Sequence, residues 1–178
     1  MHNFYSDLFY IEYFLPAVYA REPSNDHPTM SQRSKESLRT WLRLLSCEMV
    51  IEQTIRSRFR QNFNVTLPQF DVLSELERAS DKLTMSQLSK ELMVSNGNIT
   101  GVVDRLEKNS MVRRIRPDHD RRIQYIELTD AGTTEFRRMA RHHEKWVEDL
   151  FSGVSVDDME SLQGLLLKAR GSAAGTTN

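Results

Sequence analysis

The sequence predicts a mainly α-helical protein with a small β-hairpin, and three observations support this fold class. Apolar residues recur at spacings of three and four through most of residues 37–170, the pattern of helices with a buried face. Residues 112–116 and 123–128 instead carry β-branched and aromatic residues on either side of the turn-forming Pro117-Asp118-His119-Asp120, which predicts two strands. The chain has 178 residues, 39% hydrophobic and 28% charged, so one domain can bury a core. Collagen-like, low-complexity and wholly disordered proteins are excluded.

Residues 1–36 are expected to form an aromatic N-terminal extension and a linker. Seven aromatic residues precede residue 21, and Pro16, Pro23 and Pro28 then interrupt the chain. Two interpretations are open. The segment is either a short aromatic helix that docks on the rest of the protein or on a partner subunit, or a weakly ordered extension upstream of a true start at Met30.

A cytoplasmic location is expected. No apolar run approaches the roughly 18 residues of a spanning helix. Asp7 and Glu12 lie inside the apolar start of the chain, which argues against a secretory signal peptide. Cys47 is the single cysteine, so no disulfide can form within the chain and a reducing compartment is favoured.

The first predicted helix lies within residues 37–66 and is apolar on two sides. Its main stripe consists of Leu38, Trp41, Leu42, Leu45, Met49, Ile55 and Phe59, and its second stripe of Leu44, Cys47 and Ile51. Because one neighbour covers only one side of a helix, we expect the second side to be covered as well. This segment is therefore a candidate dimerisation helix.

Residues 67–132 predict a compact lobe of three short helices followed by the hairpin. Pro68 suits the first turn of a helix, and residues 84–87 have the spacing of a capping box. Ser95 offers a cap for the next helix, and Asn109 a left-handed end. The core face of that helix, with residues at i, i+3, i+4 and i+7, consists of Ile99, Val102, Val103 and Leu106.

Two further helices are predicted within residues 133–170, as C-terminal dimerisation helices, and a flexible tail in residues 171–178. Thr129 caps the first of these helices, and Ser155 with Asp158 begins the second. The apolar residues at helical spacing are Phe136, Met139, Ala140, His143, Val147, Leu150 and Phe151, then Met159, Leu162, Leu165 and Leu166.

The order of helix, turn, helix and basic hairpin is that of a winged helix-turn-helix, whose second helix enters a major groove of DNA. Residues 108–122 hold six basic and two acidic residues, a net charge of +4, although the whole chain is at −1. On a helical wheel, Gly97, Gly101, Asp104 and Lys108 lie opposite the core face, flanked by Asn98, Thr100 and Arg105. Exposed glycines would let DNA approach the backbone. The alternative is that they relieve packing against a neighbouring helix.

The segment from Asp120 to Gly132 resembles the D-x-R…L-T-x-x-G wing signature of the MarR family of bacterial transcription regulators, and the resemblance extends over about Ser37 to Leu167. It implies a homodimer in which Arg122 enters a minor groove, Asp120 orients that arginine, and residues 95–105 read a major groove. The candidate DNA contacts are Ser95, Asn96, Gly97, Asn98, Thr100, Gly101, Arg105, Lys108, Arg116, Asp120, Arg121 and Arg122.

The resemblance also implies a repressor released by a small aromatic or acidic effector, bound between the dimerisation helices and the DNA-binding lobe. Candidate pocket residues are Trp41, Leu45, Arg56, Phe70 and Trp146, each of which is more often plain core or surface. Residues 95–106 are similar to the reader helix of family members that regulate aromatic-acid catabolism. The hypothesis is therefore an aromatic acid or its CoA thioester.

Four other functions are possible for a chain of this kind. The peroxide-sensing branch of the family has a reactive cysteine near the start of its first helix, with tyrosines beside it. Here Cys47 lies well inside the helix and is expected to be a buried, unactivated thiol. The adjacent His142 and His143 point in different directions, so we predict no metal site. Motifs for catalysis or cofactor binding are missing, so neither an enzyme nor a cofactor is predicted. A winged-helix module that binds protein instead of DNA would have an apolar outer face and few wing arginines.

Overall fold

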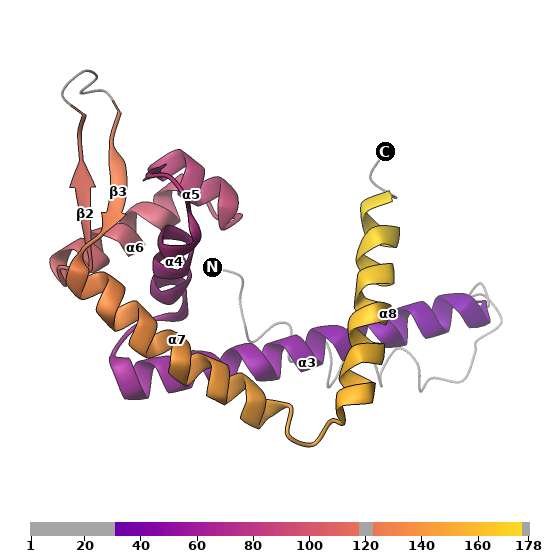
Figure 1. Cartoon of the computed structure of the whole chain (residues 1–178). Helices are drawn as coiled ribbons and strands as arrows, with labels where there is room; N and C mark the ends of the chain where they lie inside the picture. Colours follow the sequence, from indigo (N-terminus) through magenta and orange to yellow (C-terminus); the bar gives the residue numbers. More distant parts are fainter. Residues whose placement is uncertain (1–30, 118–122, 176–178) are drawn as a thin grey trace, which may run out of the picture. The chain divides into compact units, whose positions relative to one another are not determined.

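The computed structural model describes residues 31–117 and 123–175, with the side chain of Asn96 left aside. Its elements are α3 (Gln32–Phe63), α4 (Leu67–Arg78), β1 (Leu83–Thr84), α5 (Met85–Glu91), α6 (Asn96–Lys108), β2 (Val112–Ile115), β3 (Tyr125–Leu128), α7 (Asp130–Leu150) and α8 (Val156–Gly175) (Figure 1). The predicted mainly helical fold with a small sheet is confirmed. Most of the predicted N-terminal extension and the tip of the hairpin, residues 118–122, lie outside the described residues.

The predicted helix starts are confirmed by side-chain caps. Backbone N–H groups of Gln87 and Gly132 donate to the hydroxyls of Thr84 and Thr129, at 3.3 and 2.9 Å. The N–H of Asp158 donates to Ser155 at 3.2 Å. Each cap satisfies a donor that the first helical turn leaves unpaired, which places these starts where the sequence indicates.

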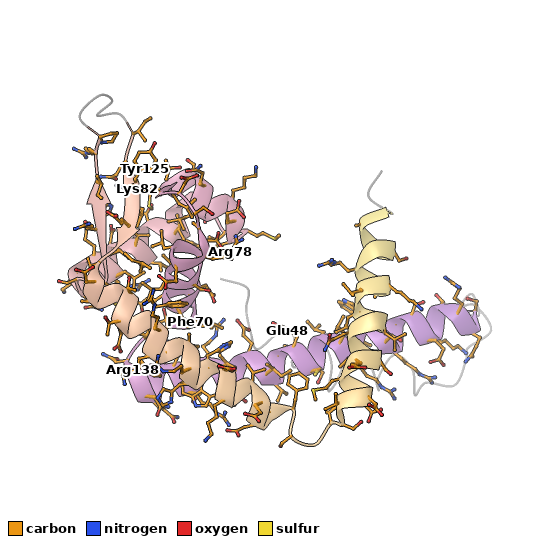
Figure 2. The ribbon with its side chains drawn as sticks, in the orientation of Figure 1. Glu48, Phe70, Arg78, Lys82, Tyr125 and Arg138 are labelled. Carbon is orange, nitrogen blue, oxygen red and sulfur yellow. The ribbon has the colours of Figure 1, made fainter. Side chains whose placement is uncertain are left out.

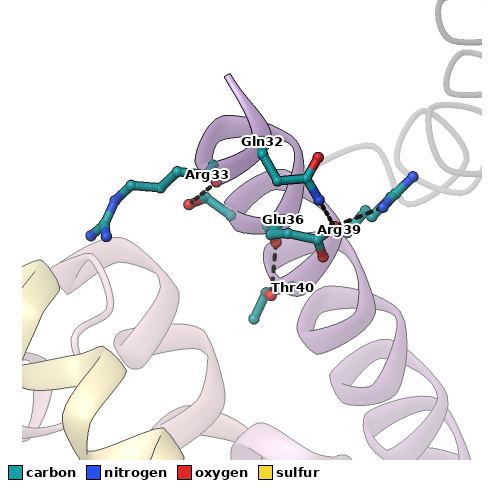
Figure 3. Close-up of polar contacts among 6 residues, drawn as sticks. Gln32, Arg33, Glu36, Arg39 and Thr40 are labelled. Atoms are coloured by element: carbon teal, nitrogen blue, oxygen red, sulfur yellow. Dashed lines mark hydrogen bonds and ion pairs between the residues drawn. The ribbon is translucent and has the colours of Figure 1, made fainter. Parts of the chain in front are cut away.

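Helix α3 begins earlier than predicted, at Gln32 instead of near Ser37. Figure 3 shows the reason: the Glu36 carboxylate accepts hydrogen bonds from Gln32 at 3.0 Å and Arg39 at 2.8 Å, and the Thr40 hydroxyl donates to the Glu36 carbonyl at 2.8 Å. Such pairs, three or four residues apart, stabilise a helix without any apolar periodicity. The apolar pattern therefore underestimates the length of α3.

A boundary between two compact units falls within α3, after Thr54. In the first unit Leu42 and Met49 are buried, as the main stripe predicts. On the second stripe, however, Leu44 is 46% exposed and Cys47 is exposed, so the expectation of two buried sides is wrong for the single chain. The physical reason is that a long helix has more apolar surface than its own chain covers.

The sheet has three antiparallel strands in the order β1-β3-β2. Strand β2 pairs with β3 in the predicted hairpin, with Arg114 opposite Ile126. Strand β1 was not predicted, because two residues are too short to show alternation, and it joins the sheet through Leu83 opposite Ile126.

The lobe after Thr54 has one core to which helices α4 to α7 and strands β2 and β3 contribute. The predicted inner face of α6 is confirmed, since Ile99 is 2% exposed and both Val103 and Leu106 are fully buried. The other buried apolar residues of this core include Phe59, Val65, Phe70, Val72, Leu73, Leu88, Val102, Val112, Ile126, Met139 and Trp146. Burial of each such large apolar side chain contributes roughly 1.5–3 kcal/mol to the stability of the fold. This core holds α6 and the hairpin in place.

Two predicted helix ends are corrected. Asn109 follows α6 with an ordinary φ of −89°, and the left-handed residue is Ser110, with φ of 57°. The N–H groups of Ser110 and Met111 reach back to Glu107 and Leu106, so the left-handed step falls one residue later. Helix α8 continues to Gly175, into the segment predicted to be a flexible tail, because Ala173 and Ala174 favour helix. None of the described helices is long and apolar enough to cross a membrane.

Candidate nucleic-acid interface

The core packing of α6 determines which of its side chains face outward. With Ile99, Val103 and Leu106 turned inward, Gly97, Asn98, Thr100, Arg105 and Lys108 are exposed and Gly101 is half-buried. These residues match the predicted outer face. A Cβ added at Gly97 or at Gly101 would meet nothing within 4 Å. Within the chain, therefore, no neighbouring helix requires either glycine, and the packing alternative loses its support.

The turn between α5 and α6 places the start of α6 at the surface. The Ser95 hydroxyl accepts the Asn98 N–H at 3.4 Å. Met93 adopts a left-handed φ of 52° and is 93% exposed. This strained turn leaves the first residues of α6 accessible, which is where helix-turn-helix proteins contact base edges.

The β2–β3 hairpin projects beyond α4, α5 and α6 (Figure 1). Two of its arginines are neutralised by ion pairs within the chain, so fewer of its positive charges are free to bind DNA than the sequence suggests. Arg113 pairs with Glu127 at 3.1 Å across the hairpin, and Arg114 pairs with Asp104 and Glu107 of α6. The hydrogen bond that Arg114 donates to Asp104 and the negative charge of Glu107 raise the pKa of Arg114, and partial burial offsets this only in part. Sequence reasoning counted both arginines as wing charge and missed these pairs.

Three of the predicted cations, Arg105, Lys108 and Arg116, are exposed and form no ion pair with another residue of the described ranges. They lie on α6 and at the end of the hairpin, where a phosphate backbone could reach them. The predicted wing-tip residues Asp120, Arg121 and Arg122 lie outside the described residues.

A groove of about 290 Å³ lies on the opposite flank of α6, toward α4, and sequence reasoning missed it. Asn98 and Arg105 supply its polar side together with Asp71 of α4. Its apolar lining is Pro68, Leu92, Val94, Ile99 and Val102. The two flanks of α6 thus differ: one is held to the wing by ion pairs and the other is open.

Two of the five predicted effector residues come together, and they form packed core. Phe59 contacts Phe70 at a centroid distance of 4.5 Å and Trp146 at 5.2 Å, and Phe70 and Trp146 are 8% and 9% exposed. Figure 2 shows Phe70 beside α7, whose Phe136 lies 5.5 Å from it. Trp41, which is 51% exposed, and Leu45 belong to the unit that ends at Thr54, while Arg56 is exposed on the part of α3 that follows.

The two adjacent histidines face different neighbours, as predicted. His142 contacts Phe63 and Trp146, whereas half-buried His143 packs against Phe59 and Phe70. Burial lowers the pKa of His143, because the aromatic surroundings disfavour its charged form. Within the described ranges, no three His, Cys, Asp or Glu side chains gather into a metal-binding group. The predicted burial of Cys47 is wrong, since the thiol is exposed.

Comparison with known proteins identifies the family. The MarR family model matches residues 65–124, from the end of α3 to the hairpin. An uncharacterised HTH-type transcriptional regulator of Bacillus subtilis, YkoM, is 36% identical over 121 residues, which cover 67% of this chain and 76% of YkoM. The chain belongs to the MarR family. The HTH-type regulator PecS of Dickeya dadantii is 30% identical over 66% of this MarR-family chain and 72% of PecS.

Solved structures agree with this assignment. A MarR-family transcriptional regulator from Silicibacter pomeroyi superposes with a TM-score of 0.71 at 30% identity, over 81% of this chain and 99% of that one. Escherichia coli MarR shares the fold, with a TM-score of 0.62. This MarR-family protein is accordingly a winged-helix, DNA-binding transcription regulator, and its relatives are regulators and not enzymes.

Proposed function

We propose that the protein binds a pseudo-palindromic operator as a homodimer, reading each half-site with α6. The observation that carries the proposal is the open outer face of α6, where Gly97 and Gly101 have free space above them and Arg105 and Lys108 flank them. A helix with glycines at exposed positions gives up about 1 kcal/mol of stability at each. Glycines at these positions allow DNA to approach the helix backbone closely, which offsets the loss of stability with a gain in binding.

The proposed DNA contacts follow from this face and from the hairpin. Ser95, Asn98, Thr100 and Arg105 are exposed on α6 or at its cap and are assigned to base edges, and Asn96 is assigned with them from its place in the sequence. Lys108 and Arg116 are assigned to phosphates. Arg122 and Asp120 are assigned to a minor groove, and Arg121 to the phosphates nearby, by the family signature alone.

We further propose a repressor released by a small effector. The similarity of residues 95–106 to regulators of aromatic-acid catabolism supports an aromatic acid or its CoA thioester. Because Phe70 and Trp146 are already packed against Phe59, an effector at that site would have to displace aromatic contacts. Titration of the protein–operator complex with benzoate-type acids and with their CoA thioesters tests this proposal. If neither class of compound releases the protein from DNA, the proposal is contradicted.

The test of DNA recognition is selection of duplexes from a random library, followed by footprinting and salt titration. We expect two protected half-sites about one helical turn, 34–36 Å, apart. Arg122→Ala should weaken binding and reduce the salt slope by about 1 if the arginine neutralises a phosphate, with Asp120→Ala milder. Arg141→Ala, an exposed arginine of α7 with the same change in charge, is the matched control. Failure to select any sequence, or binding without salt dependence, would contradict the proposal.

A further inference from the structure

The flank of α6 that faces the wing carries two carboxylates, and one arginine of β2 binds both. Asp104 and Glu107 are three residues apart and therefore lie on the same side of the helix. One terminal nitrogen of Arg114 pairs with Asp104 and the other with Glu107. The Arg114 side chain is 21% exposed, while those of Asp104 and Glu107 are 57% and 39% exposed.

This arrangement requires a guanidinium. Its planar fork presents donors in two directions at once, whereas a lysine ammonium is a single point charge on a flexible chain. Arg114 lies on the edge strand β2, where it pairs with Ile126 of the central strand β3, which is fully buried. The bridge consequently joins a rigid part of the wing to the reader helix at two points, one turn apart.

The neighbouring Arg113 provides a natural comparison. It projects from the other face of β2, is 61% exposed and pairs with Glu127 of the adjacent strand. That pair stays within the hairpin and holds nothing in α6. The two arginines have the same charge and lie side by side in sequence, but only Arg114 connects the two parts that must contact DNA together.

Without Arg114, Asp104 and Glu107 would be two uncompensated negative charges beside the outer face of α6. Like charges near a phosphate backbone oppose binding, and the opposition grows where water is excluded. In the structure both carboxylates are paired with Arg114, and the two ion pairs join the wing to the helix.

We infer that Arg114 is a positioning residue for DNA recognition, acting through Asp104 and Glu107 instead of through a DNA contact of its own. The inference rests on the proposed function, because it presumes that α6 and the wing bind one duplex. It makes Arg114 matter for affinity and specificity while the arginine contributes no phosphate contact.

The first test compares Arg114→Met with Arg113→Met on a duplex selected by the wild-type protein. Both variants lose one positive charge. Arg114→Met should lower affinity at least about tenfold per folded protein, and Arg113→Met no more than about threefold. Equal losses would show that only total charge matters and would overturn the inference. Thermal unfolding of each variant reports the folded fraction.

The second test repeats Arg114→Met in an Asp104→Asn/Glu107→Gln background. With no carboxylates to mask, loss of the arginine should cost less than about threefold, so the triple variant recovers much of the affinity. A tenfold loss that persists in this background would mean that Arg114 contacts DNA directly, and the inference fails. The triple variant also keeps the test usable if Arg114→Met alone folds poorly.

The third measurement separates positioning from charge. Asp104→Asn/Glu107→Gln with Arg114 intact should raise affinity for a random duplex and lower the ratio of selected to random binding, because the bridge that sets the wing angle is lost. An unchanged ratio contradicts positioning. If the wild-type protein selects no duplex at all, the proposed function itself has failed, and that result is distinct from any outcome for Arg114.

Discussion

The lobe from α4 to α7 buries its main apolar side chains, whereas the last helix, α8, leaves its own exposed. In the lobe, the helices and strands β2 and β3 turn apolar residues into one core, and side chains such as Leu106 and Ile126 are fully buried. In α8, no residue from Val156 to Gly175 is buried. Its exposed apolar residues include Val156, Leu162, Leu165, Leu166 and Leu167.

The difference shows which apolar surfaces the single chain buries by itself and which it leaves exposed for a partner to cover. A contiguous exposed apolar surface of this kind marks an interface in proteins of this size. The same reasoning applies to Leu44 on α3, which is 46% exposed. Residues 37–66 and 133–170 therefore stay proposed as dimerisation regions, and the lobe as a unit that folds around its own core.

The largest expected effect is in the lobe, at Gly132. A Cβ there would lie 1.9 Å from the Met111 carbonyl oxygen, and the same carbonyl accepts the Thr129 N–H at 3.1 Å. Gly132→Ala should therefore lower the free energy of unfolding by about 3 kcal/mol, because backbone must move. Denaturant unfolding measures this.

Gly171→Ala in α8 is the matched control, since its added Cβ meets nothing within 4 Å. It should be neutral or stabilising by up to about 1 kcal/mol. If Gly132→Ala costs less than about 1 kcal/mol, the backbone at the wing junction moves easily, and the lobe is less tightly packed relative to α8 than its burial indicates.

A smaller effect is expected in α8 and should appear in association instead of folding. Leu166→Glu places a charge on the apolar side of α8 in both subunits and should raise the dimer dissociation constant about a hundredfold, or about 2.7 kcal/mol. Gly164→Glu adds the same charge about 160° around the helix from Leu166, where an added Cβ meets nothing within 4 Å, and should change the dissociation constant little. Sedimentation over a concentration series distinguishes them, and equal effects would show that this face is not an interface.

Gly101→Ala tests the outer face of α6 and should move stability and binding in opposite directions. Free space at the Cβ predicts a gain of up to about 1 kcal/mol in unfolding free energy. The added methyl group should meanwhile lower operator affinity, and Gly101→Leu should lower it further. A destabilised Gly101→Ala variant with unchanged affinity per folded dimer would identify a packing glycine instead.

The smallest effect is expected at Met93, in the turn of the lobe. Its left-handed φ of 52° disfavours a side chain, and 93% exposure means that little contact is lost on removal. Met93→Gly should stabilise the lobe by about 0.5–1 kcal/mol in thermal unfolding. Val94→Gly, one residue on, should instead destabilise, because the backbone there needs no left-handed freedom.

Much of the reader helix could be predicted because its signals are local. The Ser95 cap and the spacing of Ile99, Val103 and Leu106 suffice to orient α6, and its exposed residues follow from that orientation. The effector residues could not be predicted in the same way. Phe70 and Trp146 meet through Phe59, and this meeting depends on how three helices pack.

By itself the sequence determined the order of the helices, the N-terminal caps at Thr84, Ser95, Thr129 and Ser155, the hairpin and the family to which the chain belongs, because each is encoded in residues close together along the chain. Tertiary structure alone decided that Arg114 binds Asp104 and Glu107, that Cys47 is exposed, and that a groove lies beside Arg105. Charge counted along a sequence says how many arginines a wing has. Which of them are neutralised depends on what the fold brings within reach, since an ion pair forms between side chains that are close in space.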